Sequence, residues 1–376
     1  MVTVLPRPSG LVLTANVNDP KHSGANRRAR PRLGRVRLEE VAAAAGVSPV
    51  TVSRALRRPN LVADDTRAAV QQAAEKLGYI PDLVAGGLAS ERTRQVAIVV
   101  PSFQTPAFVS TIRGISDTLR ALGYEFVLGD NNLSGDDEMA LLTSLLGRRA
   151  DAVILADIAQ SPATRALLAR SRVPVVETWT LTRNPIDMNV GFDNRAAARD
   201  ATRHMIATGR RHVGMICGPL RHNERGRQRR RGFLDAVREA DLRDDLVVEL
   251  PYPTHLRDIP EALSDLTRRA PKLDAVFCSA DSFALGAMFA AQRRGLKVPD
   301  QLAIAGLGDL ELVEHVVPSI TSARVPGYRM GQLAAQMIVC RLRGETVNQR
   351  RINVGYEIAI RESTRPTRHV NRQKNT

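Results

Sequence analysis

The sequence predicts a small all-α headpiece followed by a larger α/β core of two lobes. Three observations predict this fold class. Residues 36 to 78 show short helical patterns punctuated by glycine, β-branched runs alternate with amphipathic helical stretches from residue 95 onward, and that alternation occurs twice in succession. Alternating strands and helices indicate parallel sheets, and two successive sets indicate two lobes. A chain of 376 residues is long enough for such an arrangement.

The composition narrows the class of protein. A formal net charge of +15 favours a polyanionic partner, although a surplus of arginine is also typical of a GC-rich genome. The three cysteines are widely spaced in apolar contexts, which argues against a disulfide framework or a CxxC metal site. Because no apolar run reaches about 18 residues and the N-terminus lacks a secretory signal, we expect a cytoplasmic protein without a membrane span.

The two ends of the chain lack sustained periodicity. Residues 1–34 mix Pro, Gly, Asn and Arg and carry six basic residues against one acidic residue. We expect a disordered basic arm that adds nonspecific affinity for phosphates. Residues 366–376 are expected to form a disordered tail.

Residues 35–80 are predicted to form a helix-turn-helix domain. Apolar residues recur at helical spacing from Leu38 to Ala45, and Gly46 ends that helix. Ser48 is a good N-cap and Pro49 suits the first helical position, so a second helix is expected to run to about Arg57. A third helix is expected from about Asp64 to Leu77, capped by Gly78.

The second helix of this domain is amphipathic. Val52, Ala55 and Leu56 are expected to point inward. The opposite face carries Pro49, Val50, Ser53, Arg54 and Arg57. A helix of this kind fits the DNA major groove, where Arg54 can hold a guanine edge with two hydrogen bonds while Ser48, Thr51 and Ser53 contact phosphates. The alternative is an ordinary helical subdomain with solvated polar faces.

Residues 81–94 are predicted to be a hinge helix and linker. Val84 and Leu88 lie four residues apart, on one face of a helix, but Gly86 and Gly87 each cost about 1 kcal/mol in a helix. We expect this segment to fold only when two copies meet on DNA, with Leu88 wedged between base pairs in the minor groove. A flexible glycine-containing linker is the alternative.

The segment from 36 to 90 resembles the DNA-binding headpiece of the LacI/GalR family of bacterial repressors. The resemblance rests on EEVAAAAGVSPVTVSRAL, VADDTRAAV and KLGYIPDLVAGGLAS, in this order and spacing. It implies that Pro49, Val50 and Arg54 stand at base-reading positions and that Leu88 is the hinge lever. It also implies a set of phosphate-gripping positions: Ser48, Thr51, Ser53, Thr66 and Tyr79. Arg37, Arg57, Asp82, Gly86 and Gly87 depart from the family pattern.

Residues 95–365 are predicted to form the two-lobed core. We expect lobe 1 at about 95–190 and 325–350, and lobe 2 at about 191–324 and 351–365. One helix of lobe 2 is expected to begin at about Arg229. Ligands of such sheets bind at the carboxyl ends of the strands, in the cleft between lobes.

This core resembles the periplasmic-binding-protein-like core that the same family carries, and the similarity extends to RESTRP near the C-terminus. VPSFQTPAF, VPVVETWT, VGFDNRAAA and LGDLEL look most like the gluconate-type repressors. The resemblance implies a sugar-acid effector such as gluconate or 2-ketogluconate. A neutral hexose, pentose or polyol stays open as an alternative.

Polar and aromatic residues near predicted strand ends are the candidate effector contacts. They are Ser102, Thr105, Phe108, Trp179, Asn194, Arg229, Asp281 and Asp309. Arg229 matches the family arginine that holds the effector, and a guanidinium is a natural clamp for a carboxylate. Trp179, the single tryptophan, could stack on a sugar face or could belong to the core. The basic run Arg225 to Arg231 could equally be a solvated helix face.

The predicted partners are double-stranded operator DNA, a sugar or sugar-acid effector and a second copy of the chain. We expect a homodimer, no catalytic residues, no cofactor and no metal, because the seven histidines lack HExxH spacing and neither a GxSxG nor a GxxxxGK[ST] motif occurs. The rival interpretation is a cytoplasmic α/β sugar-binding protein or enzyme without a gene-regulatory role.

Overall fold

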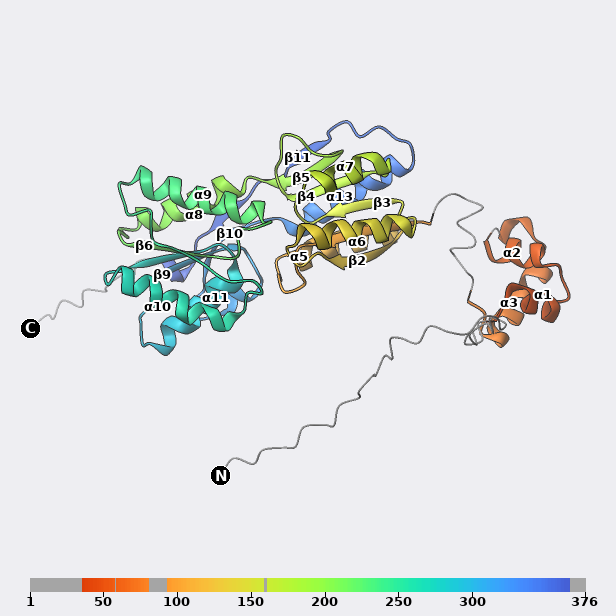
Figure 1. Cartoon of the computed structure of the whole chain (residues 1–376). Coiled ribbons are helices and arrows are strands. Elements are labelled where there is room, and N and C mark those ends of the chain that lie inside the picture. Colours follow the sequence, from red (N-terminus) through yellow and green to blue (C-terminus); the bar gives the residue numbers. More distant parts are fainter. Residues whose placement is uncertain (1–35, 58, 81–92, 159–160, 366–376) are drawn as a thin grey trace, which may run out of the picture. The chain divides into compact units, whose positions relative to one another are not determined.

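A computed structural model describes residues 36–57, 59–80, 93–158 and 161–365, and the chain divides after Leu83 into two compact units. Figure 1 labels their helices and strands. The first unit contains the helical headpiece, and the second unit contains the α/β core. Each is described separately. Among the described residues no helix has both the length and the apolar character needed to cross a membrane.

The headpiece consists of three α-helices within its described residues. They are α1 (Leu38–Ala45), α2 (Pro49–Arg57) and α3 (Asp64–Leu77), with a 3-10 turn at Pro59–Leu61. Gly46 and Gly78 end α1 and α3 with φ of 67° and 66°, a left-handed conformation that suits glycine. At the start of α2, the amide of Thr51 donates to Ser48 Oγ at 3.1 Å. The predicted helices and their stop signals are confirmed.

Small apolar side chains form the headpiece core. Buried there are Val41, Ala42, Val52, Ala55, Val70, Ala73 and Ala74. Leu56 packs against this cluster, so the predicted inward face of α2 is confirmed. Because α2 contributes only its apolar side to the cluster, its polar side is left for solvent or a partner.

The first sheet of the core has the strand order β11-β5-β4-β3-β1-β2, all parallel. Its strands are β1 (Gln95–Val100), β2 (Glu125–Asp130), β3 (Ala152–Leu155), β4 (Val175–Thr180), β5 (Met188–Phe192) and β11 (Arg351–Asn353). Helices cover both faces (Figure 1): α5 (Phe108–Ala121) and α13 (Gly327–Leu342) on one, α6 (Gly135–Gly147) and α7 (Pro162–Ser171) on the other. This is lobe 1.

The second sheet has the order β12-β10-β9-β8-β6-β7, in which only the β12 to β10 pair is antiparallel. Its strands are β6 (Val213–Cys217), β7 (Val247–Glu249), β8 (Ala275–Cys278), β9 (Ala303–Gly308), β10 (Thr321–Arg324) and β12 (Glu357–Ala359). Two helix pairs cover it: α8 (Asn194–Ala207) with α9 (Glu224–Glu239), and α10 (Ile259–Arg269) with α11 (Asp281–Arg293). This is lobe 2, and the predicted fold class is confirmed.

Each lobe contains one helix pair in close backbone contact. A Cβ atom on Gly114 of α5 would overlap the carbonyl oxygen of Tyr328 on α13, and one on Gly232 of α9 would overlap the carbonyl oxygen of Arg195 on α8. Only glycine allows backbones to approach this closely.

Three predicted boundaries need correction. Strand β11 pairs with β5 through Asn353, so lobe 1 extends beyond the expected limit at 350. Helix α9 begins at Glu224, five residues before Arg229, because the Asn223 side chain accepts from the Gly226 amide at 3.0 Å and caps the helix. Strand β4 runs to Thr180, so Trp179 lies inside a strand and not after one.

Candidate functional site

The polar face of α2 is open in the headpiece. Ser48, Pro49, Val50 and Arg54 are exposed, and Thr51 and Ser53 are half-buried. The side chain of Val50 is 58% exposed although it is apolar. Within the described headpiece the acid-base contact that forms is Arg67 to Asp64 at 2.8 Å, so no acid neutralises Arg54. This face presents a cation, hydroxyls and an apolar contact together.

The structure describes only some of the other predicted DNA contacts. Thr66 on α3 is half-buried, and Tyr79 packs against the headpiece core after α3. Arg57 belongs to α2, but its side chain lies outside the described residues, as do Val84 and Leu88 of the predicted hinge. Their predicted contacts stay predictions.

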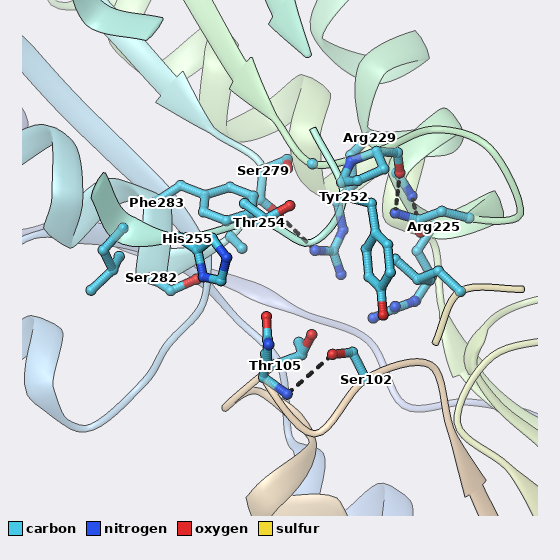
Figure 2. A pocket seen from close by; sticks show the side chains of 18 residues that line it. Ser102, Thr105, Arg225, Arg229, Tyr252, Thr254, His255, Ser279, Ser282 and Phe283 are labelled. Carbon is cyan, nitrogen blue, oxygen red and sulfur yellow. Dashed lines mark hydrogen bonds between the residues drawn. The ribbon is translucent and has the colours of Figure 1, made fainter. Parts of the chain in front are cut away.

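A cavity of about 140 Å³ lies between the two lobes of the core (Figure 2). Loops at the carboxyl ends of β1, β2, β6, β7 and β8 line it, together with the first turns of α9. Its polar and aromatic lining residues are Ser102, Gln104, Thr105, Asn223, Arg225, Arg229, Tyr252, Thr254, His255, Ser279, Ser282 and Phe283. A cavity of roughly 150 Å³ holds a benzene-sized molecule, so this one suits a small molecule.

Arg229 lines this cavity and has one donor group without a hydrogen-bond partner. Its Nε donates to Asn194 Oδ1 at 2.8 Å, and its Nη1 donates to the Ser279 carbonyl at 2.7 Å. Its Nη2 is buried without a hydrogen-bond partner. Burial lowers the pKa of Arg229 to about 9, and the like charge of Arg225 adds to the shift. Both hydrogen-bond partners are neutral, and the nearby charges of Asp157 and Asp281 only partly offset the burial of this cation, so an anionic ligand would satisfy the orphan donor and add a counterion.

Arg225 lies one helical turn before Arg229 but has a different environment. Its Nε lies 3.1 Å from Asp157 Oδ2, and Asp157 Oδ1 accepts from the Thr180 hydroxyl at 2.6 Å. Its guanidinium carbon lies 4.6 Å from the ring centre of Phe108. Asp157 follows β3 in lobe 1, whereas Arg225 belongs to lobe 2, so this ion pair joins the lobes.

The structure brings three of the predicted effector contacts to the cavity: Ser102, Thr105 and Arg229. Figure 2 shows Ser102 and Thr105 on the opposite side from Arg229. Asn194 is fully buried and orients Arg229 from behind. The alternative of a solvated basic helix face is wrong for Arg225 and Arg229, which are both buried.

Trp179 and Phe108 require a correction. The Trp179 side chain is 1% exposed, its indole nitrogen donates to Thr111 Oγ1 at 3.2 Å, and its ring packs edge-on against Phe108. Neither ring lines the cavity. Trp179 is therefore a core residue, because strand β4 turns it away from the ligand side.

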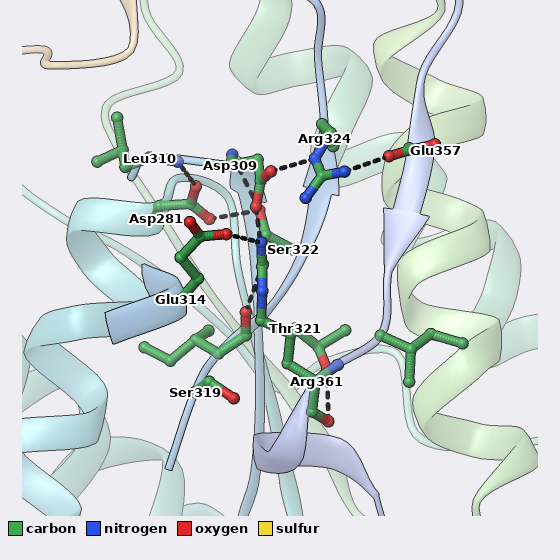
Figure 3. A network of polar contacts seen from close by, with 12 residues as sticks. Asp281, Asp309, Leu310, Glu314, Ser319, Thr321, Ser322, Arg324, Glu357 and Arg361 are labelled. Atoms are coloured by element: carbon green, nitrogen blue, oxygen red, sulfur yellow. Dashed lines mark hydrogen bonds and ion pairs between the residues drawn. The ribbon is translucent and has the colours of Figure 1, made fainter. Parts of the chain in front are cut away.

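Asp281 and Asp309 also lie off the cavity, in a polar network within lobe 2 (Figure 3). Ser322 Oγ donates to Asp281 Oδ1 at 2.7 Å and accepts from the Asp309 amide at 3.1 Å. Asp309 forms ion pairs with Arg324 and, at 2.7 Å, with Arg361. Burial raises the pKa of Asp281 to about 6. These carboxylates hold loops together and are not free for a ligand, which corrects both predictions.

Several cavity residues were not predicted. Tyr252, His255 and Phe283 follow β7 and β8 and add aromatic surface. Arg225 could have been identified from its spacing of four from Arg229, which places both on one helix face. Among the described residues, no group of three or more His, Cys, Asp or Glu side chains is placed to hold a metal ion.

A helix-turn-helix with an open basic face, joined to a two-lobed core with a small polar cavity, defines a transcriptional regulator with a small-molecule-binding core. Residues 37–82 match the model of bacterial regulatory proteins of the lacI family, and residues 202–364 match a periplasmic binding protein-like domain. The chain belongs to the LacI family. It therefore belongs with DNA-binding regulators and not with enzymes.

Individual relatives support this assignment. The HTH-type transcriptional regulator GntR of Escherichia coli K12 is 33% identical over 322 residues, which cover 86% of this chain and 96% of that protein. A LacI family regulator from Silicibacter pomeroyi is 30% identical, with a TM-score of 0.82 over 88% of this chain and 100% of that one. A transcriptional regulator CelR in complex with cellobiose is 31% identical, with a TM-score of 0.62 over 88% of this chain and 100% of that one.

Proposed function

We propose that this regulator is a homodimeric repressor of genes for sugar or sugar-acid catabolism. In this proposal the α2 helices of two copies bind a palindromic operator, and a sugar acid such as gluconate or 2-ketogluconate releases them. The likeness to GntR supports the gluconate-type assignment.

The proposal of a sugar acid rests on the buried Nη2 of Arg229. A guanidinium with one free donor matches a carboxylate oxygen in both charge and geometry. A neutral hydroxyl would satisfy the donor but would leave the guanidinium without an acid in direct contact. The surrounding Ser102, Thr105 and His255 offer hydrogen bonds for the hydroxyls of a polyol chain.

The release mechanism couples the cavity to the headpiece through the lobes. The cavity wall comes from both lobes, so a ligand that contacts both stabilises one lobe arrangement over another. Such a shift requires the ligand to bind the DNA-released arrangement more tightly. In this proposal the segments 81–94, of which residues 81–92 lie outside the described residues, pair in the minor groove and separate when the lobes move.

A neutral sugar is the second candidate effector. The aromatic side chains of Tyr252 and Phe283 at the cavity suit the apolar face of a sugar ring, and the related CelR forms a complex with cellobiose. The buried Arg229, whose direct hydrogen-bond partners are both neutral, argues against this candidate.

A thermal-shift screen of sugars, polyols and sugar acids on the purified protein tests the proposal. A true effector at about 100 times its Kd stabilises the protein by roughly 2.7 kcal/mol. The active compound is then added to the protein bound to its own upstream DNA. Release by gluconate or 2-ketogluconate supports the proposal; stabilisation by neutral sugars alone would overturn the sugar-acid assignment.

A further inference from the structure

The two arginines of the cavity differ in their charge balance. Arg229 contacts neutral acceptors only, the amide oxygen of Asn194 and the carbonyl oxygen of Ser279. Arg225 faces the same cavity but is paired with the carboxylate of Asp157. The site therefore contains two cations, of which Arg225 is in direct contact with an acid, whereas Arg229 is influenced by Asp157 and Asp281 without a hydrogen bond to either.

The ion pair between Arg225 and Asp157 is almost completely buried. Its side chains are 8% and 4% exposed, respectively, and the Thr180 hydroxyl fixes the second carboxylate oxygen. Removing one partner from such a pair leaves an uncompensated buried charge, which is strongly unfavourable. Asp157 is therefore held firmly beside Arg225 for as long as the lobes keep this arrangement.

We infer that Asp157 is a specificity-determining residue that restricts the cavity to ligands with a single carboxylate. The inference rests on the proposed function of a sugar-acid effector. Asp157 occupies the anion position on Arg225, so that only Arg229 is left to receive a carboxylate from the ligand. A second ligand carboxylate directed at Arg225 meets the like charge of Asp157, and like-charge contacts are an effective means of rejecting a wrong ligand.

Gluconate and glucarate provide matched probes, because they share a six-carbon polyol chain and differ in having one or two carboxylates. Isothermal titration of the full-length protein measures the Kd of each, and their ratio is the readout. We expect the parent protein to favour gluconate by at least about tenfold. Asp157→Asn removes the carboxylate beside Arg225, so the ratio of the two Kd values should shift toward glucarate by about tenfold or more.

Control variants separate this effect from a general disturbance of the fold. Asp235 lies on α9, as Arg225 does, but it pairs with Arg195 of α8 and does not line the cavity. The Kd ratio of Asp235→Asn should therefore match that of the parent. The double variant Arg225→Gln with Asp157→Asn carries no unpaired charge at this position. It therefore provides a second test of the role of Asp157 if Asp157→Asn does not fold. It should still bind gluconate and still reject glucarate.

The possible results are decisive. An unchanged ratio in Asp157→Asn, a glucarate preference in the parent, or a gain of glucarate binding in the double variant would each overturn the role of Asp157. Those results leave the sugar-acid effector in place, because gluconate or glucarate still binds. A parent protein that binds neither acid overturns both the effector class and this inference.

Discussion

Arginine is used differently in the headpiece and in the core. Arg54 on the open face of α2 is exposed and has no acidic partner within the described headpiece. In the core, exposed arginines pair repeatedly with acids, as Arg195 does with Asp235 and Arg243 with Asp245. The surplus charge of +15 is therefore a poor guide to DNA binding by itself, and the pairing of each arginine is the better guide.

The largest expected effect is on Arg54. Arg54→Ala should weaken operator binding by at least about 30-fold, because each bidentate contact to guanine contributes about 1–3 kcal/mol and a dimer loses two. Thermal unfolding should be unchanged, since the side chain is exposed and unpaired. Fluorescence anisotropy with labelled operator DNA measures the loss.

Arg243→Ala is the matched control, because it removes one positive charge from the core, where Asp245 already neutralises it. Its operator affinity should equal that of the parent at moderate ionic strength. Equal losses in the two variants would mean that total charge, and not the α2 face, determines binding.

The next effect concerns the buried arginine of the core. Arg229→Met should remove the ligand-induced stabilisation of roughly 2.7 kcal/mol expected at 100 times the Kd, because the carboxylate loses its counterion. Operator binding should persist without ligand. Differential scanning fluorimetry and anisotropy measure the two properties; a normal ligand response in this variant would place the site elsewhere.

The two units also differ in how much apolar surface they bury. Val52 is fully buried in a headpiece core whose buried residues are all valine or alanine. Val52→Ala should destabilise the headpiece by roughly 2 kcal/mol, through lost burial and a residual void. Faster hydrogen exchange at headpiece amides, with unchanged protection in the core sheets, is the expected observation. Faster exchange throughout the chain would show that the two units unfold together.

The last effect is the pH dependence from Asp281. Its pKa is raised by burial to about 6, so the folded state holds a proton that the unfolded state releases near pH 4. Its contribution to stability therefore falls as the pH rises from about 4 to 6. Asp281→Asn should gain stability relative to the parent over this window. Urea unfolding at several pH values measures the difference, and a constant difference would contradict the shift.

Local signals allowed much of the fold to be predicted. The bounds of α2 and α3 follow from the Ser48 and Pro49 start signals and from the Gly78 stop signal, all of which act within one turn. The rule that ligands meet strand ends placed Ser102, Thr105 and Arg229 on the cavity.

Contacts between distant residues could not be predicted in this way. Arg225 and Asp157 are 68 positions apart and meet only because α9 and the segment after β3 lie together at the lobe junction. Trp179 was misplaced because the length of β4 depends on pairing with its neighbours β3 and β5, which no local pattern encodes. The pairing of Asp281 with Ser322 likewise depends on the register between β9 and β10.

The glycine contacts of Gly114 with Tyr328 and of Gly232 with Arg195 have a mechanical consequence. Helices whose backbones touch have no side-chain layer between them that could repack, so we expect the two helices of each pair to move as one unit. We therefore expect the core to bend at the three chain segments that cross between the lobes, which follow β5, β10 and β11. An alanine at either glycine would push the two helices of its pair apart. In the proposed release mechanism, less of the motion at the cleft would then reach the headpiece.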